Sequence, residues 1–273
     1  MAIIAISREL AALGDETAHT LAEKLKYKFV DKTVIEERIN TLGGSSCKFD
    51  KYDEKKPSFW ASISNGRDDY LHFLKSAVFA EAEHGNAVFM GRGAGILLKN
   101  VPGVFSVFLA APLEIRVERV KSYFHCDEKK ARQIIEHSDH AREGFHRFFF
   151  GTKWNDAGNY HLALNTWHLH PELCSEIIKS MRDGLLTEDM AVLGRQRIKE
   201  LTIGQAVKHC ISYEKKLQIH FLEVSVTNGK VILYGATKAQ SFVEDAITYA
   251  MELTPDFTVQ SEIQLVQEYS VIP

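Results

Sequence analysis

Two continuous apolar segments restrict the folds open to this chain more than any other feature. The first, NAVFMGRGAG (residues 86–95), runs from a strand-like stretch into a glycine-rich turn, and the second, VFSVFLAAP (104–112), ends at Pro112. Apolar runs without polar alternation are typical of strands buried on both faces, and helical patterns lie between such runs here. The sequence therefore predicts an α/β fold, in which helices cover both faces of a parallel sheet.

The segments before and after these strands continue the alternation of strands and helices. Residues 3–6 form another short apolar strand, and the apolar residues of 18–25 follow at helical spacing, so the chain starts with a strand, a loop and a helix. Further elements are expected in this order: a strand at 29–30, a helix at 34–39, a long helix from residue 68, helices at 113–122 and 127–149, a strand in 160–166 and a closing helix at 171–184.

The chain changes character after residue 183, and we expect a main domain at 1–183, a connector at 184–199 and a small α+β domain at 200–273. Alternating residues on both sides of Asn228-Gly229 predict a β-hairpin, because both central residues of the favoured turn adopt positive φ. A helix and a last strand are expected after the hairpin. Gly229 and Gly235 are interpreted as structural, serving the turn and a close backbone approach.

Charge and composition argue against several classes of function. The chain has 33 Lys and Arg against 36 Asp and Glu, without a dense basic block, so no nucleic-acid partner is expected. Neither a signal peptide nor a transmembrane segment is expected, because the apolar start is short and lacks a preceding positive region. We expect a cytoplasmic protein with reduced thiols, since its cysteines are far apart and form no CxxC pair: Cys47, Cys126, Cys174 and Cys210.

Two clusters of side chains follow residue 127. His137 and His140 lie three residues apart near acidic residues, but no HExxH or other strong ligand spacing is present, so no metal site is predicted. The phenylalanines of residues 145–150 are expected to pack in a core or an interface rather than to stack on a base.

Residues 1 to about 183 resemble the cytidylate kinase-like family, a branch of the P-loop nucleoside monophosphate kinases. The resemblance lies in five segments in this order: IAISREL, LAEKLKYKFVDK, FMGRGAGILL, FLAAPLEIRVERV and HAREGFHRFFFGTKWNDAGNYHLALNT. It implies a P-loop kinase fold and, in an active member, ATP and magnesium as cofactors with a CMP-like nucleoside monophosphate or another small molecule as substrate. Through VTNGKVILYGAT the tail resembles a BON domain, which implies a bacterial protein and a sensing or assembly role, with a protein partner or self-association.

The phosphate loop departs most from the family pattern. Working loops use glycines whose backbone N–H groups face the phosphates, a Lys that reaches them, and a Ser or Thr hydroxyl that helps hold magnesium. Aligned to the family's Gly-Ser-Gly-Gly loop, this chain places Gly14 where a Lys would stand. The full set of loop residues is Ala11, Ala12, Leu13, Gly14, Asp15 and Glu16.

These substitutions change what the loop is expected to do. An alanine in the left-handed conformation costs about 1–2 kcal/mol, so the loop is expected to adopt another shape. Asp15 is expected to cap the first helix, and both acidic residues suit the positive end of its dipole. The protein would then supply its own anion where the phosphates of ATP would lie.

The resemblance implies nucleotide-binding roles for several basic residues, because an arginine fork binds phosphate oxygens in pairs. Arg92 in the glycine-rich turn would contact the acceptor nucleotide, and Arg142 and Arg147 would belong to the lid. Arg116 and Arg119 would bind phosphate, or else form a solvated face with neighbouring acidic residues.

Two further positions complete the candidate set. Asp31 ends the second strand and would bind nucleotide or cap the next helix. Arg8 is a candidate for a cation that compensates at Gly14, as are Lys153 and the lid arginines. The candidate nucleotide-binding residues are therefore Arg8, Gly14, Asp31, Arg92, Arg116, Arg119, Arg142 and Arg147.

Three functions remain open at this point, and no catalytic residue is assigned. The first is a nucleotide-binding family member with weak or lost kinase activity, whose tail senses or assembles. The second is an active kinase that phosphorylates CMP or another small molecule with ATP. The third is an interaction protein that binds no nucleotide.

Overall fold

The computed structural model describes residues 1–43 and 64–266. It divides into two compact units, Met1–Arg195 and Gln196–Pro273, and the boundary falls within the predicted connector. A single helix, α8 (Glu188–His209), runs through that boundary. The predicted free thiol Cys47 lies outside the described residues, whereas Cys126, Cys174 and Cys210 are free.

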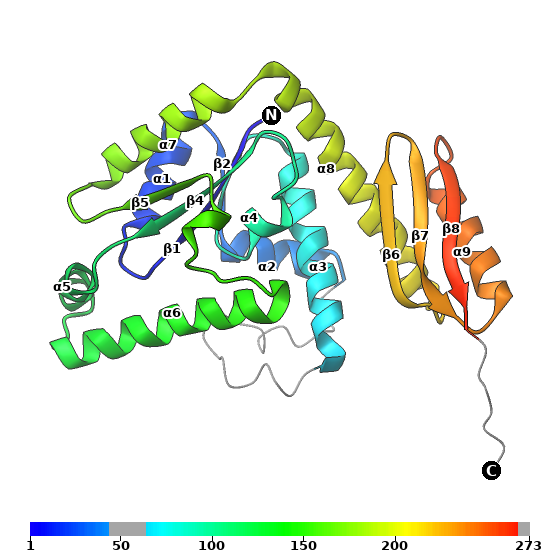
Figure 1. Ribbon diagram of the computed structural model, residues 1–273, viewed down its shortest axis with the longest axis horizontal. Coiled ribbons are helices and arrows are strands. Elements are labelled where there is room, and N and C mark those ends of the chain that lie inside the picture. The colour runs from blue at the N-terminus through cyan, green and yellow to red at the C-terminus, as the bar shows by residue number, and fades with distance from the viewer. Residues whose placement is uncertain (44–63, 267–273) are drawn as a thin grey trace, which may run out of the picture. The chain divides into compact units, whose positions relative to one another are not determined.

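A five-stranded parallel sheet forms the centre of the first unit, which confirms the predicted fold class (Figure 1). Its strand order is β2-β3-β1-β4-β5, so β1 lies between the two strands predicted from the apolar runs. The strands are β1 (Ile3–Arg8), β2 (Lys28–Val30), β3 (Ala87–Met90), β4 (Val104–Ala110) and β5 (Leu162–Asn165). β3 is buried at all four residues, which explains its lack of polar alternation.

Helices cover both faces of this sheet. On one face Ile4 and Ile6 pack in a core with Leu21 of α1 and Ile178 of α7. On the other face a Cβ added at Gly95 of α4 would lie 3.5 Å from the Cβ of Ala5. The helices of the first unit, besides α8, are α1 (Gly14–Leu25), α2 (Lys32–Thr41), α3 (Ser64–Glu83), α4 (Ala94–Leu97), α5 (Leu113–Phe124), α6 (Glu128–Phe150) and α7 (Pro171–Leu185).

Local chemistry explains where several of these helices begin. The Asp127 carboxylate accepts a hydrogen bond from Lys130 N at 2.7 Å, which caps α6 at the predicted residue. Pro171 occupies the first turn of α7, where its missing N–H costs nothing. The long helix α3 begins at Ser64, earlier than the predicted start near residue 68.

The second unit is a small mixed sheet with helices, as the sequence predicted (Figure 1). β6 (His220–Thr227) and β7 (Lys230–Thr237) form the predicted antiparallel hairpin, in which Asn228 and Gly229 have φ of 49° and 75°. α9 (Gln240–Leu253) then leads into β8 (Thr258–Leu265), which pairs with β7 in parallel. None of the described helices is long and apolar enough to cross a membrane.

A buried carboxylate joins β2, α2 and α3. Glu81 has an exposed side-chain fraction of 2% and accepts hydrogen bonds from Lys28 Nζ at 2.5 Å and Arg38 Nε at 2.7 Å. Burial acts to raise the pKa of Glu81, but the hydrogen bonds and charges of Lys28 and Arg38 outweigh it and hold the pKa below its usual value. The ionised group therefore stabilises the fold.

We expect Glu81→Gln to lower the free energy of unfolding by about 2 kcal/mol at pH 7, because it leaves two cations without their shared anion. Because the pKa of Glu81 is lower in the folded than in the unfolded protein, its ionised carboxylate stabilises the fold at pH values above the unfolded-state pKa. This stabilisation is lost as the pH falls through the folded-state pKa, so the destabilisation by Glu81→Gln should shrink on acidification. Urea unfolding between pH 3.5 and 7 measures both effects. Glu83→Gln on the exposed face of α3 is the matched control, and an equal cost in the two variants would contradict the assignment.

Candidate functional site

The loop between β1 and α1 keeps two non-glycine residues in the left-handed conformation. Ala11 and Leu13 have φ of 60° and 58°, so the prediction that the loop avoids this conformation is wrong. The loop is held from outside. Glu9 N donates to Leu109 O at 2.9 Å, and Leu10 N donates to Asp139 Oδ1 at 3.1 Å. Bonds to other elements thus fix a backbone that local preference disfavours.

Gly14 and Arg8 are in direct contact at the start of α1. A Cβ added at Gly14 would lie 2.3 Å from Arg8 Cγ, so the glycine leaves room for the arginine side chain. Arg8 Nη2 lies 3.3 Å from Asp15 Oδ1 and forms an ion pair with it. Arg8 is therefore near Gly14, as a compensating cation would be, but Asp15 already takes up its charge.

The predicted cap by Asp15 is wrong. Leu13 is the N-cap residue of α1 and makes no side-chain cap hydrogen bond, because its side chain carries no acceptor. Asp15 lies inside the first turn, two residues after the N-cap position, and its side chain pairs with Arg8. Asp15 and Glu16 nevertheless stand at the positive end of the helix, where negative side chains are stabilised.

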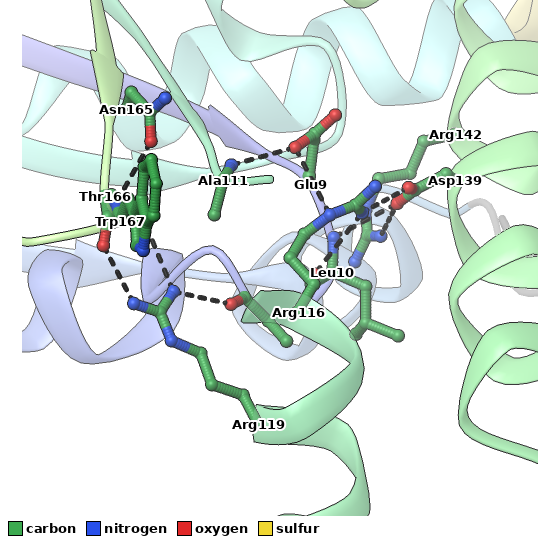
Figure 2. Close-up of polar contacts among 11 residues, drawn as sticks. Glu9, Leu10, Ala111, Arg116, Arg119, Asp139, Arg142, Asn165, Thr166 and Trp167 are labelled. Carbon is green, nitrogen blue, oxygen red and sulfur yellow. Dashed lines mark hydrogen bonds and ion pairs between the residues drawn. The ribbon is translucent and has the colours of Figure 1, made fainter. Parts of the chain in front are cut away.

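Arg116 of α5 lies beneath the loop between two carboxylates (Figure 2). Its Nη1 donates to Asp139 Oδ2 at 2.5 Å, and its Nε lies 3.5 Å from Glu9 Oε2. The residue is 7% exposed, so the predicted alternative of a solvated face with neighbouring acids is wrong for Arg116. Glu114 and Glu118 instead pair with Arg132 and Lys121.

The two carboxylates bind further groups. Glu9 Oε2 accepts a hydrogen bond from Ala111 N at 3.0 Å, and burial, the largest influence, raises the pKa of Glu9. Asp139 Oδ1 lies 3.6 Å from Arg142 Nη1. The series of ion pairs Glu9–Arg116–Asp139–Arg142 thus links the loop to α5 and α6.

Arg119, one helical turn after Arg116, binds backbone carbonyls instead of a carboxylate (Figure 2). Its Nη1 donates to Ala11 O at 3.0 Å, and its Nη2 donates to Thr166 O at 2.8 Å. Thr166 follows β5 directly. Arg119 therefore ties the phosphate loop to the carboxyl end of the fifth strand, and its side chain is not part of a solvated salt-bridged face.

A pocket of about 440 Å³ opens over this loop. The side chains of Tyr123 and Phe124, which are 78% and 50% exposed, lie along it at the end of α5. The charged residues that line the pocket are equal in number: Arg8, Arg119 and Arg142 against Glu9, Asp15 and Glu16. The pocket therefore has no formal excess of positive charge, although it lies at the carboxyl edge of a parallel sheet, where such folds bind ligands.

The other candidate residues lie outside this pocket. Arg92 follows β3 with φ of 53° and is 3% exposed, and its Nη2 donates to Glu36 Oε1 at 2.5 Å. Asp31 caps α2, since its carboxylate accepts from Val34 N at 3.0 Å. Arg147 is largely exposed on α6, 3.9 Å from Glu143. Lys153 lines a separate small cavity.

The residues present do not fit ATP with magnesium in the usual way. The loop has no Lys, and Thr17, the first hydroxyl residue of α1, is fully buried. The acidic pair at the start of α1 would face a triphosphate with like charge. Within residues 1–43 and 64–266 there is also no group of three or more His, Cys, Asp or Glu side chains that could hold a metal ion.

The carboxylates that bind the candidate arginines are not among the residues predicted from the sequence. Asp139 lies three residues before Arg142 on one helix face, a spacing that could have indicated that pair. Glu9 and Glu36 carry no such signal, because their arginine partners are distant in sequence: Glu9 pairs with Arg116 and Glu36 with Arg92.

The strained loop gives a testable difference between two neighbouring alanines. We expect Ala11→Gly to change the free energy of unfolding by less than about 0.5 kcal/mol, because relief of the left-handed strain offsets the entropy that glycine adds to the unfolded chain. Ala12→Gly removes a fully buried methyl group and is expected to destabilise by about 1.5 kcal/mol. Chemical denaturation of both variants measures the difference, and equal costs would contradict the left-handed assignment at Ala11.

Comparison with curated proteins gives two relatives. A cytidylate kinase from Sulfolobus acidocaldarius is 34% identical over 94 residues, which cover 34% of this chain and half of that protein. A cytidylate kinase from Methanopyrus kandleri is 26% identical over 182 residues, which cover 63% of this chain and 88% of that protein.

A solved structure supports this fold. An uncharacterized protein from Eubacterium ventriosum superposes with a TM-score of 0.53 at 22% identity and covers 67% of this chain and 99% of its own. A shikimate kinase from Acinetobacter baumannii, in complex with shikimate, superposes with a TM-score of 0.39 at 15% identity and covers 68% of this chain and 96% of its own. The model of the Cytidylate kinase-like family matches residues 3–168, and the chain belongs to this family.

Proposed function

We propose that the protein is a nucleotide-binding member of the cytidylate kinase-like family in which phosphoryl transfer from ATP is weak or lost. The observation that carries this proposal is the charge of the phosphate loop. Arg8, Arg116 and Arg142 are each within ion-pair distance of a carboxylate of the protein, and Arg119 is bound to backbone carbonyls.

Phosphoryl transfer depends on positioning and on neutralisation of charge, since the protein does little covalent chemistry. A triphosphate entering this pocket would have to displace the Arg8–Asp15 ion pair and approach Glu16. No lysine of the loop would replace the lost cation. A ligand with fewer negative charges meets less repulsion, and a nucleoside monophosphate is such a ligand.

The nucleotide class rests on the family and on its relatives. The family model covers the phosphate loop and the turn that contains Arg92, and both curated relatives are cytidylate kinases. A CMP-like monophosphate is therefore the proposed ligand, with another small molecule as the broader class. Arg92, Asp31 and Arg147 stay candidates for this ligand, and the tail, which resembles a BON domain of bacterial proteins, is proposed to sense or assemble.

One observation favours the second candidate, an active kinase. The loop keeps the left-handed residues Ala11 and Leu13 and an open pocket, so the backbone that would surround a phosphate persists. In that case Arg119 and Arg142, which line the pocket, are the cations available to the transferred group.

Thermal unfolding with a panel of nucleotides separates the candidates. We expect CMP or another monophosphate to raise Tm, and ATP with magnesium to leave it unchanged at millimolar concentration, because stabilisation scales with RT ln(1 + [L]/Kd). Stabilisation by ATP with magnesium, together with CMP-dependent formation of ADP, would establish the active kinase instead. No shift with any nucleotide would favour an interaction protein.

Removal of the loop's own anion provides a direct test. We expect Asp15→Ser to bind ATP with magnesium at least about tenfold more tightly than the wild type, since Arg8 is then available to a phosphate and one like charge is gone. Glu23→Ser, exposed at the other end of α1, is the matched control and should change affinity little. Isothermal titration calorimetry measures both, and an equal gain in the two variants would argue against a specific role for Asp15.

A further inference from the structure

The strand β8 forms an open edge of the second unit's sheet. The sheet order is β6-β7-β8, and β8 pairs with β7 at all eight of its residues. No other strand of the described chain pairs with it. Its sequence, TVQSEIQL, contains no proline and no basic residue, the features with which proteins commonly block an open strand.

The opposite strand, β6, is protected. Its pairing with β7 shifts register between His220 and Glu223, and Phe221 in the shifted stretch has a left-handed φ of 54°. Arg197 Nη1 also donates to Val226 O at 2.8 Å and occupies a backbone acceptor. A bulge and a bound side chain thus interrupt β6, whereas β8 is regular.

The hydrogen bonds identify which backbone groups of β8 point outward. Thr258 N donates to Gly229 O and Val266 N donates to Thr237 O, both at 2.9 Å. In a parallel ladder the backbone N–H and C=O groups of alternate residues point to the same neighbouring strand. The backbone groups of even-numbered β8 residues therefore point to β7, and those of odd-numbered residues point away from it. Ile263 N agrees, since it donates locally to Ser261 Oγ at 3.2 Å.

We propose that β8 pairs with β8 of a second copy of this chain, antiparallel and about a twofold axis at Ser261. Ser261 then lies opposite Ser261 of the partner subunit, and Val259 lies opposite Ile263 of the partner subunit. The outward groups of these odd-numbered residues exchange roughly six backbone hydrogen bonds, as in the hydrogen-bonded pairs of antiparallel strands. Ile263 N gives up its local bond to Ser261 Oγ to make one of them. The two three-stranded sheets become one continuous sheet.

Side chains favour this register over its neighbour. With the axis at Ser261, the half-buried Val259 and Ile263 make apolar cross-strand pairs, and Gln260 lies opposite Glu262 of the partner subunit. With the axis at Glu262, two carboxylates would face each other directly. The strand is thus complementary to itself without juxtaposed like charges, which is why a second copy is the proposed occupant.

A pair of substitutions at one exposed position tests the register. In the dimer, residue 260 faces Glu262 of the partner subunit twice, so Gln260→Lys is expected to lower the dimer Kd about fivefold and Gln260→Glu to raise it about fivefold. Both effects should decrease at high salt. Sedimentation equilibrium of the full chain measures Kd, and a dimer that responds equally to both substitutions would overturn the proposal.

Ser261→Pro tests the backbone pairing. The N–H of residue 261 points away from β7, so proline removes an outward donor and leaves the β7–β8 ladder intact. We expect a monomer with unchanged circular dichroism. A wild-type chain that stays monomeric at about 100 µM, or a dimer that Ser261→Pro leaves intact, would overturn the proposal. If the proline variant does not fold, the two Gln260 variants decide. A dimer that the Gln260 substitutions do not affect would mean that the chain dimerises through another surface, and this would also overturn the proposal.

Discussion

The geometry of the candidate site depends on the Arg116 guanidinium, which lies buried between Glu9 and Asp139. The two carboxylates in turn hold backbone N–H groups, Glu9 that of Ala111 and Asp139 that of Leu10. One cation therefore connects the end of β4, the phosphate loop and α6. Loss of the arginine would leave two half-buried anions close together, so the loop cannot change its charge without changing its support.

This arrangement explains how a loop with few glycines adopts left-handed backbone conformations that glycine usually provides. Ala11 and Leu13 pay the steric cost of the left-handed conformation, and the bonds at Glu9, Leu10 and Arg119 fix both ends of the turn. The same bonds occupy polar groups that would otherwise be available to bind a phosphate. Arg119 is the clearest example, because its guanidinium closes on Ala11 O and Thr166 O. Shape is thus retained while charge is internally balanced.

The elements that were predictable from sequence are those whose signals are local. Apolar runs identified β3 and β4, Asp127 marked the start of α6, and Asn228-Gly229 marked the hairpin, since each depends on residues adjacent in the chain. The site was predicted only in part.

The remainder of the site depends on pairs that the sequence separates. Glu9 meets Arg116 and Glu36 meets Arg92 only after the sheet has formed, so no spacing could indicate them. At Ala11 tertiary bonds overrode local preference, and the cap of α1 was misplaced because helix ends shift by one or two residues. Failures therefore concentrate where long-range contacts decide, which is the site itself.

The second unit lies outside the residues that the family model matches. The family model ends at residue 168, and the unit from Gln196 onward closes its own core, in which Leu233 packs with Ala246 and Ala250. Because this core is separate, a contact made by the β8 backbone need not alter the phosphate loop. Self-pairing there would place two kinase-fold units on one particle and raise the effective concentration of one for any partner bound to the other. If phosphoryl transfer is weak or lost, as proposed, the protein would act in this way through assembly.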